Sequence, residues 1–382
     1  MLRFIKNLLI TNLLLRWDYA WREKDLKREL ALFWDTPLPA EKIKNTNTEQ
    51  YEQLISVCGL GGWSGSSIIS DFLLEFDDVS AIGGTIHRDK PNKNSDFECS
   101  FWHGDWYEEG SILSLEKAIF TEKIYFNFGA LNFSRFVLKC FMGKIWIYDD
   151  YYLQRSKEFL FDLIECHWRW TKYAWLKDKE TEYYYTPPKE PKRRERLNPL
   201  YDEIIEVIWK KFTIEEFRAK AKQYMEDFLK HIPSKKFLIC PQLLHTGVFD
   251  AKMFEDYFGN IKMFYVWRDP RDQYAGARRR LRTYIPKDPI VFSKRFKKFV
   301  DNLSNINHPN CMVLRLEDFC TNYDEVSKKI IKFLGLNPNT HKRKFEFFDP
   351  KISAQKIGSY KNCPNQEAIK IIEKELKEYC WD

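Results

Sequence analysis

The chain has 382 residues, 44% of them hydrophobic and 16% aromatic, which is enough for one large α/β domain with a sizeable insertion, or for two domains. The net charge of +7 favours an anionic ligand or surface, and no nucleic-acid-binding signature is present, so we expect no nucleic-acid partner. Nine cysteines and seven histidines without CxxC, HExxH or comparable spacing argue against a metal site and predict reduced thiols in a cytoplasmic protein.

The first 50 residues are expected to form an N-terminal helical segment and a linker. Residues 1–17 are apolar from Leu8 to Leu15, but polar residues interrupt the run, so no stretch is long enough to span a bilayer. No small-residue cleavage site follows, which argues against a cleaved signal peptide. We expect this helix to pack on the main domain, and the alternative is contact with a membrane surface through its basic and tryptophan flanks. A polar linker follows from Pro37 to Thr48.

The most informative stretch, residues 57–69 (VCGLGGWSGSSII), lies near the start of the main domain, which we place at 51–382. Its first residues close an apolar run typical of a buried strand, four glycines allow positive φ and close backbone approach, and apolar residues at helical spacing follow from Ile68 to Phe76. A strand, glycine-rich turn and helix in this order can bind a phosphate or sulfate through unpaired amides at the start of the helix. The alternative is a turn in which small residues serve packing alone.

A second strand is predicted from Val79 to Ile86, and an insertion of mainly helical character from about 89 to 235. Inside the insertion, Thr186 to Arg196 is rich in proline and charge and predicts an exposed connector. The insertion also carries many aromatic residues, which either fill its core or stack on sugar rings. They include Trp168, Trp170, Trp175 and Tyr183 to Tyr185.

Alternating strands and helices resume after the insertion. This order predicts a parallel sheet, so the expected fold class is α/β, with a phosphate-binding turn that resembles a P-loop. Residues 321–324 (TNYD) resemble a capping box for a helix that ends at Gly335, and a last helix is predicted from Asn365 to Tyr379. The other predicted strands are Phe237 to Cys240, Ile261 to Trp267 and Cys311 to Leu316, and the other predicted helices are Val248 to Tyr257 and Arg271 to Arg282.

A second candidate motif follows the strand that ends at Trp267. Residues 268–272 (RDPRD) place an arginine at a strand end and turn at a proline into a helix. Ligands of open α/β sheets bind at such strand ends, where a guanidinium can hold a phosphate by two hydrogen bonds. The alternative is an ion pair between Arg268 and Asp272 that only stabilises the turn.

Together these segments resemble the sulfotransferases that use 3′-phosphoadenosine-5′-phosphosulfate (PAPS). Residues 63–67 (WSGSS) resemble the loop that holds the 5′-phosphosulfate, in the form found in carbohydrate sulfotransferases, and residues 268–272 resemble the motif for the 3′-phosphate. Residues 314–319 and 331–336 are similar to a structural strand and helix of the family, and residues 357–362 look like its C-terminal segment, which folds over the nucleotide. The resemblance covers about 52–87 and 236–382.

The resemblance implies sulfuryl transfer from PAPS, a co-substrate, to a hydroxyl of a carbohydrate or glycan. Trp63 stands where the family usually has a lysine or arginine, and Gly276 stands where many members have a phosphate-binding serine. Because this chemistry depends on positioning and on charge near the leaving oxygen, a cation from elsewhere in the sequence can serve, such as Arg88, Lys356 or Lys361. The implied nucleotide-binding residues are Trp63, Ser64, Gly65, Ser66, Ser67, Arg268, Lys356, Gly358 and Lys361.

The candidate general base is His87, at the end of the second predicted strand, with His103 in reserve; the alternative is a histidine without a catalytic role. The basic residues between 278 and 298 are expected to form mainly a solvated face, and Arg278 is the nearest that could hold the 3′-phosphate. Two other functions remain open. One is a catalytically silent nucleotide- or glycan-binding protein, and the other is a nucleotide-dependent kinase, which the absence of a lysine after Gly65 disfavours.

Overall fold

The structure is a computed structural model that describes residues 26, 28–39, 50–59, 64–82, 112–121, 128–142, 150–171, 203–241, 251–279, 285–304 and 306–381. The chain forms two compact units. The first contains Met1–Lys44 and Phe101–Tyr224, and the second contains Asn45–Ser100 and Met225–Asp382. None of the helices within the described ranges is both long enough and apolar enough to cross a membrane.

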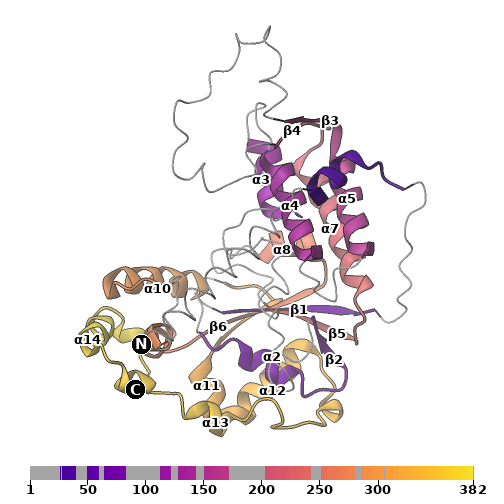
Figure 1. The fold of residues 1–382 in the computed structure, drawn as a ribbon. Coiled ribbons are helices and arrows are strands. Elements are labelled where there is room, and N and C mark those ends of the chain that lie inside the picture. The colour runs from indigo at the N-terminus through magenta and orange to yellow at the C-terminus, as the bar shows by residue number, and fades with distance from the viewer. Residues whose placement is uncertain are drawn as a thin grey trace, which may run out of the picture. The chain divides into compact units, whose positions relative to one another are not determined.

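A five-stranded parallel sheet is the centre of the second unit, so the predicted α/β class with a parallel sheet is confirmed (Figure 1). Its strand order is β2-β5-β1-β6-β7, in which chain neighbours β1 and β2 are separated by β5. The strands are short apolar runs, as expected for a sheet covered by helices on both faces. Their bounds are β1 (Gln53–Gly59), β2 (Val79–Ala81), β5 (Phe237–Pro241), β6 (Ile261–Trp267) and β7 (Cys311–Arg315).

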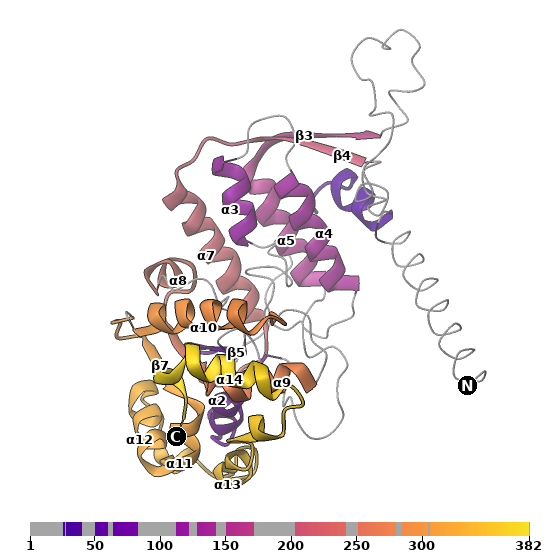
Figure 2. The ribbon, with the colours of Figure 1, turned by 90° about the vertical axis from the view of Figure 1, so that its left-hand side faces the viewer.

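Helices cover both faces of this sheet. On one face, α2 (Ser67–Leu73), α11 (Leu316–Thr321) and α12 (Tyr323–Leu334) pack against the strands, with α13 (Pro350–Ala354) in contact with α11. On the other face lie α8 (Ala251–Phe258) and α10 (Pro289–Ser304) in both views (Figures 1 and 2). The helices α9 (Pro270–Arg279) and α14 (Gln366–Glu375) contact each other and α10.

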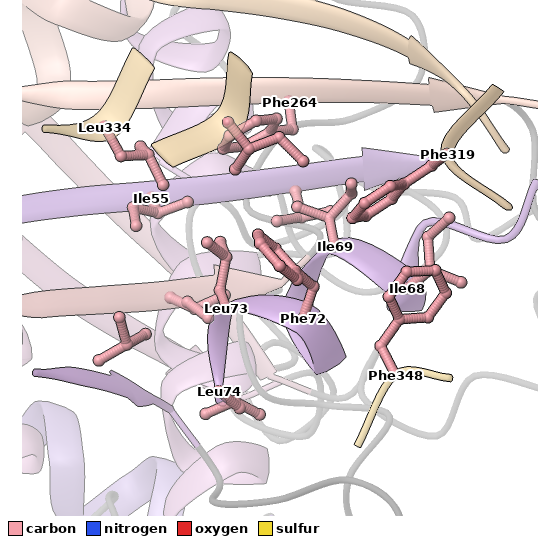
Figure 3. Packing of buried hydrophobic residues seen from close by; sticks show 14 of the residues in the cluster. Ile55, Ile68, Ile69, Phe72, Leu73, Leu74, Phe264, Phe319, Leu334 and Phe348 are labelled. Carbon is pink, nitrogen blue, oxygen red and sulfur yellow. The ribbon is translucent and has the colours of Figure 1, made fainter. Parts of the chain in front are cut away.

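The core between the sheet and α2 explains why α2 lies where it does. The predicted helical spacing of apolar residues after the glycine-rich turn is confirmed, because Ile69 and Phe72 are fully buried. Figure 3 shows both beside Phe319 of α11, and the rings of Phe72 and Phe319 are 5.3 Å apart in an edge-to-face arrangement. This packing holds the start of α2 close to the end of β1.

Most strands and helices predicted in the second unit begin and end within a few residues of the observed bounds, and the predicted and observed bounds of β6 are the same. The predicted capping box at the start of α12 is wrong, because its cap residue Asn322 makes no side-chain capping bond. Thr321 is the last residue of α11 and donates its hydroxyl to the carbonyl of Glu317 instead, at 2.9 Å. Gly335 ends α12 in the left-handed conformation, as predicted. The predicted strand from Val79 reaches only Ala81, and residues 83–86 lie outside the described part.

The last predicted helix is divided into two elements. Helix α14 begins after Asn365, whose side chain accepts the amide of Ala368 at 3.0 Å, and ends at Glu375. A 3₁₀ turn, η7 (Lys377–Tyr379), follows, with Leu376 buried between the two. Two further 3₁₀ turns in this unit are η5 (Pro338–Thr340) and η6 (Ser359–Asn362).

The first unit is mainly helical but also contains two antiparallel strands that the sequence did not indicate. Its buried aromatic core includes Phe159 and Tyr224, whose rings stack 4.6 Å apart. The indole of Trp34 donates to the hydroxyl of Ser134 at 3.1 Å, which ties the helical residues 28–35 to this core. The elements are α3 (Ile112–Thr121), α4 (Phe128–Met142), α5 (Asp150–Leu163), β3 (Ile164–Thr171), β4 (Glu203–Trp209) and α7 (Ile214–His231), the last of which continues into the second unit.

Candidate functional site

The two motifs follow neighbouring strands at the edge of the sheet where its parallel strands end, which we call the carboxyl edge. Strands β1 and β6 are neighbours, and Gly59, the last residue of β1, lies opposite Val266. The glycine-rich turn and Arg268 therefore leave the sheet side by side. The connection from β5 to β6 also crosses from one side of β1 to the other, and ligands of open α/β sheets bind beside such a crossover.

Two glycines of the turn are required by close approach. Gly65 has φ +81°, and a Cβ atom there would collide with the side chain of Leu316, the first residue of α11. A Cβ on Gly59 would collide with the hydroxyl of Ser64 and lie 2.7 Å from that of Ser66. The serines of the turn thus fold back toward the end of β1, with Ser64 buried and Ser67 exposed.

Arg268 is held in place through one nitrogen of its guanidinium, Nη2. Its side chain is 11% exposed, its Nη2 donates to the carbonyl of Lys356 at 3.2 Å, and the same atom lies 3.2 Å from a carboxylate oxygen of Asp272. The ion pair that the sequence offered as an alternative is therefore present. The Nε atom, however, is buried and has no hydrogen-bond partner among the described residues. Within the described ranges, Nη1 makes no hydrogen bond either, so the guanidinium has N–H groups that are not paired with the protein.

The guanidinium donors of Arg271, by contrast, are hydrogen-bonded to other groups of the protein. It makes bonds of 2.8 to 3.2 Å with the carboxylate of Asp269, and it donates to Glu373 and to the carbonyl of Trp381, both at 2.6 Å. Its guanidinium also lies 4.2 Å from the ring centre of Tyr360. Arg271 therefore anchors the C-terminal residues to the turn, and Arg268 is the arginine of the motif that remains for a ligand.

The predicted C-terminal segment lies against the start of α9. The carboxylate of Asp272 accepts the amides of Gly358 and Tyr360, both at 2.8 Å, and the hydroxyl of Ser359 at 2.9 Å. Gly358 has φ +76°, which allows the chain to turn at this point. The structure thus brings together Arg268 and residues 356–360.

Three more cations surround this segment. Lys356 and Lys361 are exposed, and neither ammonium forms an ion pair within the described ranges. A Cβ on Gly358 would lie 4.0 Å from the Nζ of Lys361, so this ammonium sits close to the turn. Arg279 of α9 donates to the hydroxyl of Ser359 at 3.0 Å. With Arg268, these residues carry four positive charges on or beside the segment that the carboxylate of Asp272 binds.

A buried carboxylate links the two motifs. Glu317 accepts the amide of Asp269 at 2.9 Å and the guanidinium of Arg315 at 3.2 Å, and it directly follows the residue that contacts Gly65. Burial raises the pKa of Glu317 above its ordinary value, although the amide of Asp269 and the charge of Arg315 act in the opposite direction. The start of α11 is therefore the common support of the glycine-rich turn and of the Arg268 turn.

The thiol of Cys320 shows that Arg268 and Lys356 are near each other in space. Burial and the charge of Glu317 raise the pKa of this thiol to about 11, and the positive charges of Arg268 and Lys356 both act to lower it. The side chain is therefore a neutral thiol at neutral pH, flanked by two cations. It has no part in the chemistry we propose.

Several predicted residues lie outside the described part of the chain. They are Trp63, His87, Arg88 and His103. Sequence reasoning missed the supporting roles of Asp269 and Glu317 and the bonds of Asp272 to residues 358–360, because a carboxylate that binds groups far away in the sequence leaves no local pattern. Within the described ranges, no group of three or more histidine, cysteine, aspartate or glutamate side chains could hold a metal ion.

No family profile matches the chain, and no curated protein matches it. Solved structures similar to it include the sulfotransferase domain from the curacin biosynthetic pathway, at 13% identity over 86% of this chain and 99% of that chain, with a TM-score of 0.35. Another is the sulfotransferase domain from the Synechococcus PCC 7002 olefin synthase, at 11% identity over 90% of this chain and 100% of that chain, with a TM-score of 0.34. A third is the sulfotransferase STF9 from Mycobacterium avium, at 11% identity over 93% of this chain and 80% of that chain, with a TM-score of 0.33.

Proposed function

We propose that the chain transfers the sulfuryl group of PAPS to a hydroxyl of a carbohydrate or glycan. This proposal is supported by two observations: β1, which precedes residues 64–67, and β6, which precedes Arg268, end side by side at the carboxyl edge, and Arg268 and Asp272 bond to residues 356–360. PAPS is anionic at two places, the 5′-phosphosulfate and the 3′-phosphate. The carboxyl edge offers a glycine-rich turn for the first and a group of cations for the second.

In this proposal, Arg268 binds the 3′-phosphate through guanidinium N–H groups that are not paired with the protein, and Lys356 and Lys361 add charge. The turn with Trp63, Ser64, Gly65, Ser66 and Ser67 holds the 5′-phosphosulfate. Gly358 contributes by its conformation, because its amide is already bonded to Asp272.

Gly276 lies in α9 and stands where many members of the resembled family have a phosphate-binding serine. Asp272, Gly276 and Arg279 are spaced to lie on one face of α9, and the first and last both bond to Ser359. A Cβ on Gly276 would meet nothing within 4 Å, so there is open space at the position where many members of the resembled family have a serine. That space supports a ligand group at this face of the helix.

Two parts of the proposal rest on the sequence alone. A carbohydrate acceptor follows from the Ser-Gly-Ser-Ser form of the loop, and His87 is the candidate base for the acceptor hydroxyl. The rival proposal of a catalytically silent binding protein has its own support in Trp63, which replaces a basic residue beside the bridging oxygen.

The first experiment compares binding of adenosine 3′,5′-bisphosphate and ATP by calorimetry, in the wild type and in Arg268→Ala. We expect the bisphosphate to bind more tightly than ATP, and Arg268→Ala to weaken it by about 1.5 to 3 kcal/mol, roughly ten- to hundredfold. Arg343→Ala is the matched control. Arg343 also has a buried Nε without a partner among the described residues and donates to a backbone carbonyl, that of Leu74, but it lies away from the carboxyl edge.

Unchanged affinity in Arg268→Ala, or an equal loss in Arg343→Ala, would rule out the proposed role of Arg268. Preference for ATP would contradict the sulfotransferase proposal as a whole. The second experiment measures transfer of labelled sulfate from PAPS to a panel of glycans. Bisphosphate binding without transfer to any hydroxyl acceptor would favour the silent binding protein.

A further inference from the structure

We propose that Asp272 is a positioning residue, which arranges residues 356–361 so that Arg268 and the lysines of this segment meet one phosphate group. The proposal deepens the function proposed above and rests on it. Asp272 itself touches no ligand in this arrangement. It acts through the segment that it holds.

The geometry around Asp272 supports this role. Its side chain is fully buried, and its two oxygens together accept from the amides of Gly358 and Tyr360 and the hydroxyl of Ser359. One of them also lies 3.2 Å from Nη2 of Arg268 in an ion pair. Buried carboxylates are costly unless they are paired and hydrogen-bonded, and here the partners come from both the arginine and the C-terminal segment. One carboxylate therefore holds Arg268 beside the segment that carries Lys356 and Lys361.

The backbone of the segment has no amides left for an anion. The amides of Gly358 and Tyr360 donate to Asp272, that of Ser359 donates to the carbonyl of Lys356, and that of Lys361 donates to the carbonyl of Gly358. Successive amides at a left-handed turn often form an anion-binding concavity, and here the protein's own carboxylate fills it. A phosphate at this place must be bound by side chains.

Two accounts of Asp272 predict opposite effects on anion binding when its charge is removed. In one account only its negative charge matters, and in the other it positions residues 356–361. Removal of a negative charge among four cations should strengthen anion binding if only the electric field matters. If Asp272 positions the segment, the same change should weaken binding, because an amide nitrogen would then face the N–H donors of Gly358 and Arg268. The sign of the effect therefore separates the two accounts.

The experiment measures, by calorimetry, how much more tightly adenosine 3′,5′-bisphosphate binds than adenosine 5′-monophosphate. We expect this preference to fall about tenfold in Asp272→Asn, the factor for one lost charge-assisted bond. Hydrogen exchange at the amides of Gly358 and Tyr360 should accelerate in the same variant. The matched control is Glu75→Gln, which alters another buried carboxylate that accepts two backbone amides, those of Phe347 and Phe348, and should leave the preference unchanged.

A preference that stays equal or rises in Asp272→Asn overturns the positioning role. Should this variant not fold, Ser359→Ala tests the same role, since it removes one hydrogen bond to the Asp272 carboxylate and keeps the charge of that carboxylate. We expect the preference for the bisphosphate to fall two- to fivefold in Ser359→Ala. A preference that does not fall overturns the proposal. A wild-type protein without any preference for the bisphosphate would overturn the proposed function itself, and the inference with it. A wild-type preference that survives both substitutions overturns the inference alone.

Discussion

Two buried carboxylates hold the C-terminal part of the chain to the sheet, and they do so at opposite edges. At the carboxyl edge, Asp272 binds the amides of Gly358 and Tyr360. At the other edge, which we call the amino edge, Glu75 lies between α2 and the start of β2 and accepts the amides of Phe347 and Phe348. A buried carboxylate that accepts two successive or nearly successive amides of a segment far away in the sequence is thus present at both edges.

The surroundings of the two carboxylates differ in a way that bears on function. Glu75 also accepts the Nε2 of His341 at 2.8 Å, and the His341 ring stacks on Phe76 at 4.3 Å, so its partner is packed against the core. Asp272 instead shares Arg268 with the carbonyl of Lys356, and exposed lysines lie close by. The comparison shows that a structural anchor becomes part of a candidate site when cations with remaining donors surround it at strand ends.

The first prediction concerns the buried ion pair between Arg271 and Asp269 at the carboxyl edge. Arg271→Ala should lower the free energy of unfolding by about 3 to 5 kcal/mol, because Asp269 would be left buried without its ionic partner. Arg343→Ala, at the amino edge, removes a bond to the backbone carbonyl of Leu74 and should cost about 1 kcal/mol. Denaturant unfolding measures both. Equal losses would remove the distinction between the two edges.

The next effect concerns close approach at the glycine-rich turn. Gly65→Ala should cost roughly 2 to 4 kcal/mol, because the residue has positive φ and its new Cβ would collide with Leu316. Gly335→Ala, at the end of α12, is the control with φ +67° but open space, and should cost only about 1 to 2 kcal/mol. Thermal and denaturant unfolding provide the values. A cost at Gly65 no greater than that at Gly335 would mean that the contact with α11 does not constrain the turn.

Glu75→Gln tests the buried carboxylate at the amino edge. It should lower the free energy of unfolding by about 1 to 3 kcal/mol, since a neutral amide replaces a buried acceptor of three bonds. Nucleotide binding should not change, because the amino edge carries no part of the proposed site. Calorimetry with the bisphosphate checks this, and a weakened affinity would show that the two edges are coupled.

The smallest expected effect depends on pH and concerns Glu317. Because burial raises its pKa in the folded protein, folded Glu317 holds its proton at pH values where the unfolded chain has lost it, so wild-type stability falls as pH rises above about 4.5 through this window. Glu317→Gln has no such proton to lose. The difference in melting temperature, variant minus wild type, should therefore increase as pH rises from 4 to 7 on the order of a few degrees at most. A difference that stays constant or decreases would contradict the raised pKa.

Much of the second unit could be predicted from local pattern. The strand at Ile261–Trp267 is a continuous apolar run that ends at a charged turn, and Gly335 follows a helix whose apolar residues repeat at helical spacing. Such features depend on residues close together in the sequence. The capping box was wrong because Thr321 belongs to the preceding helix and uses its hydroxyl there.

Local sequence pattern was sufficient to predict the order of strands and helices in the second unit, the glycine-rich first turn and the position of Arg268 at a strand end. The choice of which arginine of the motif remains for a ligand depends on the three-dimensional fold, because Arg271 finds its partners in Glu373 and Trp381, about a hundred residues away. The fold also decided that Asp272 fills the turn at Gly358. The physical reason is that a buried polar group is satisfied by whatever donor or acceptor the fold brings within about 3 Å, and distance along the chain does not limit that choice.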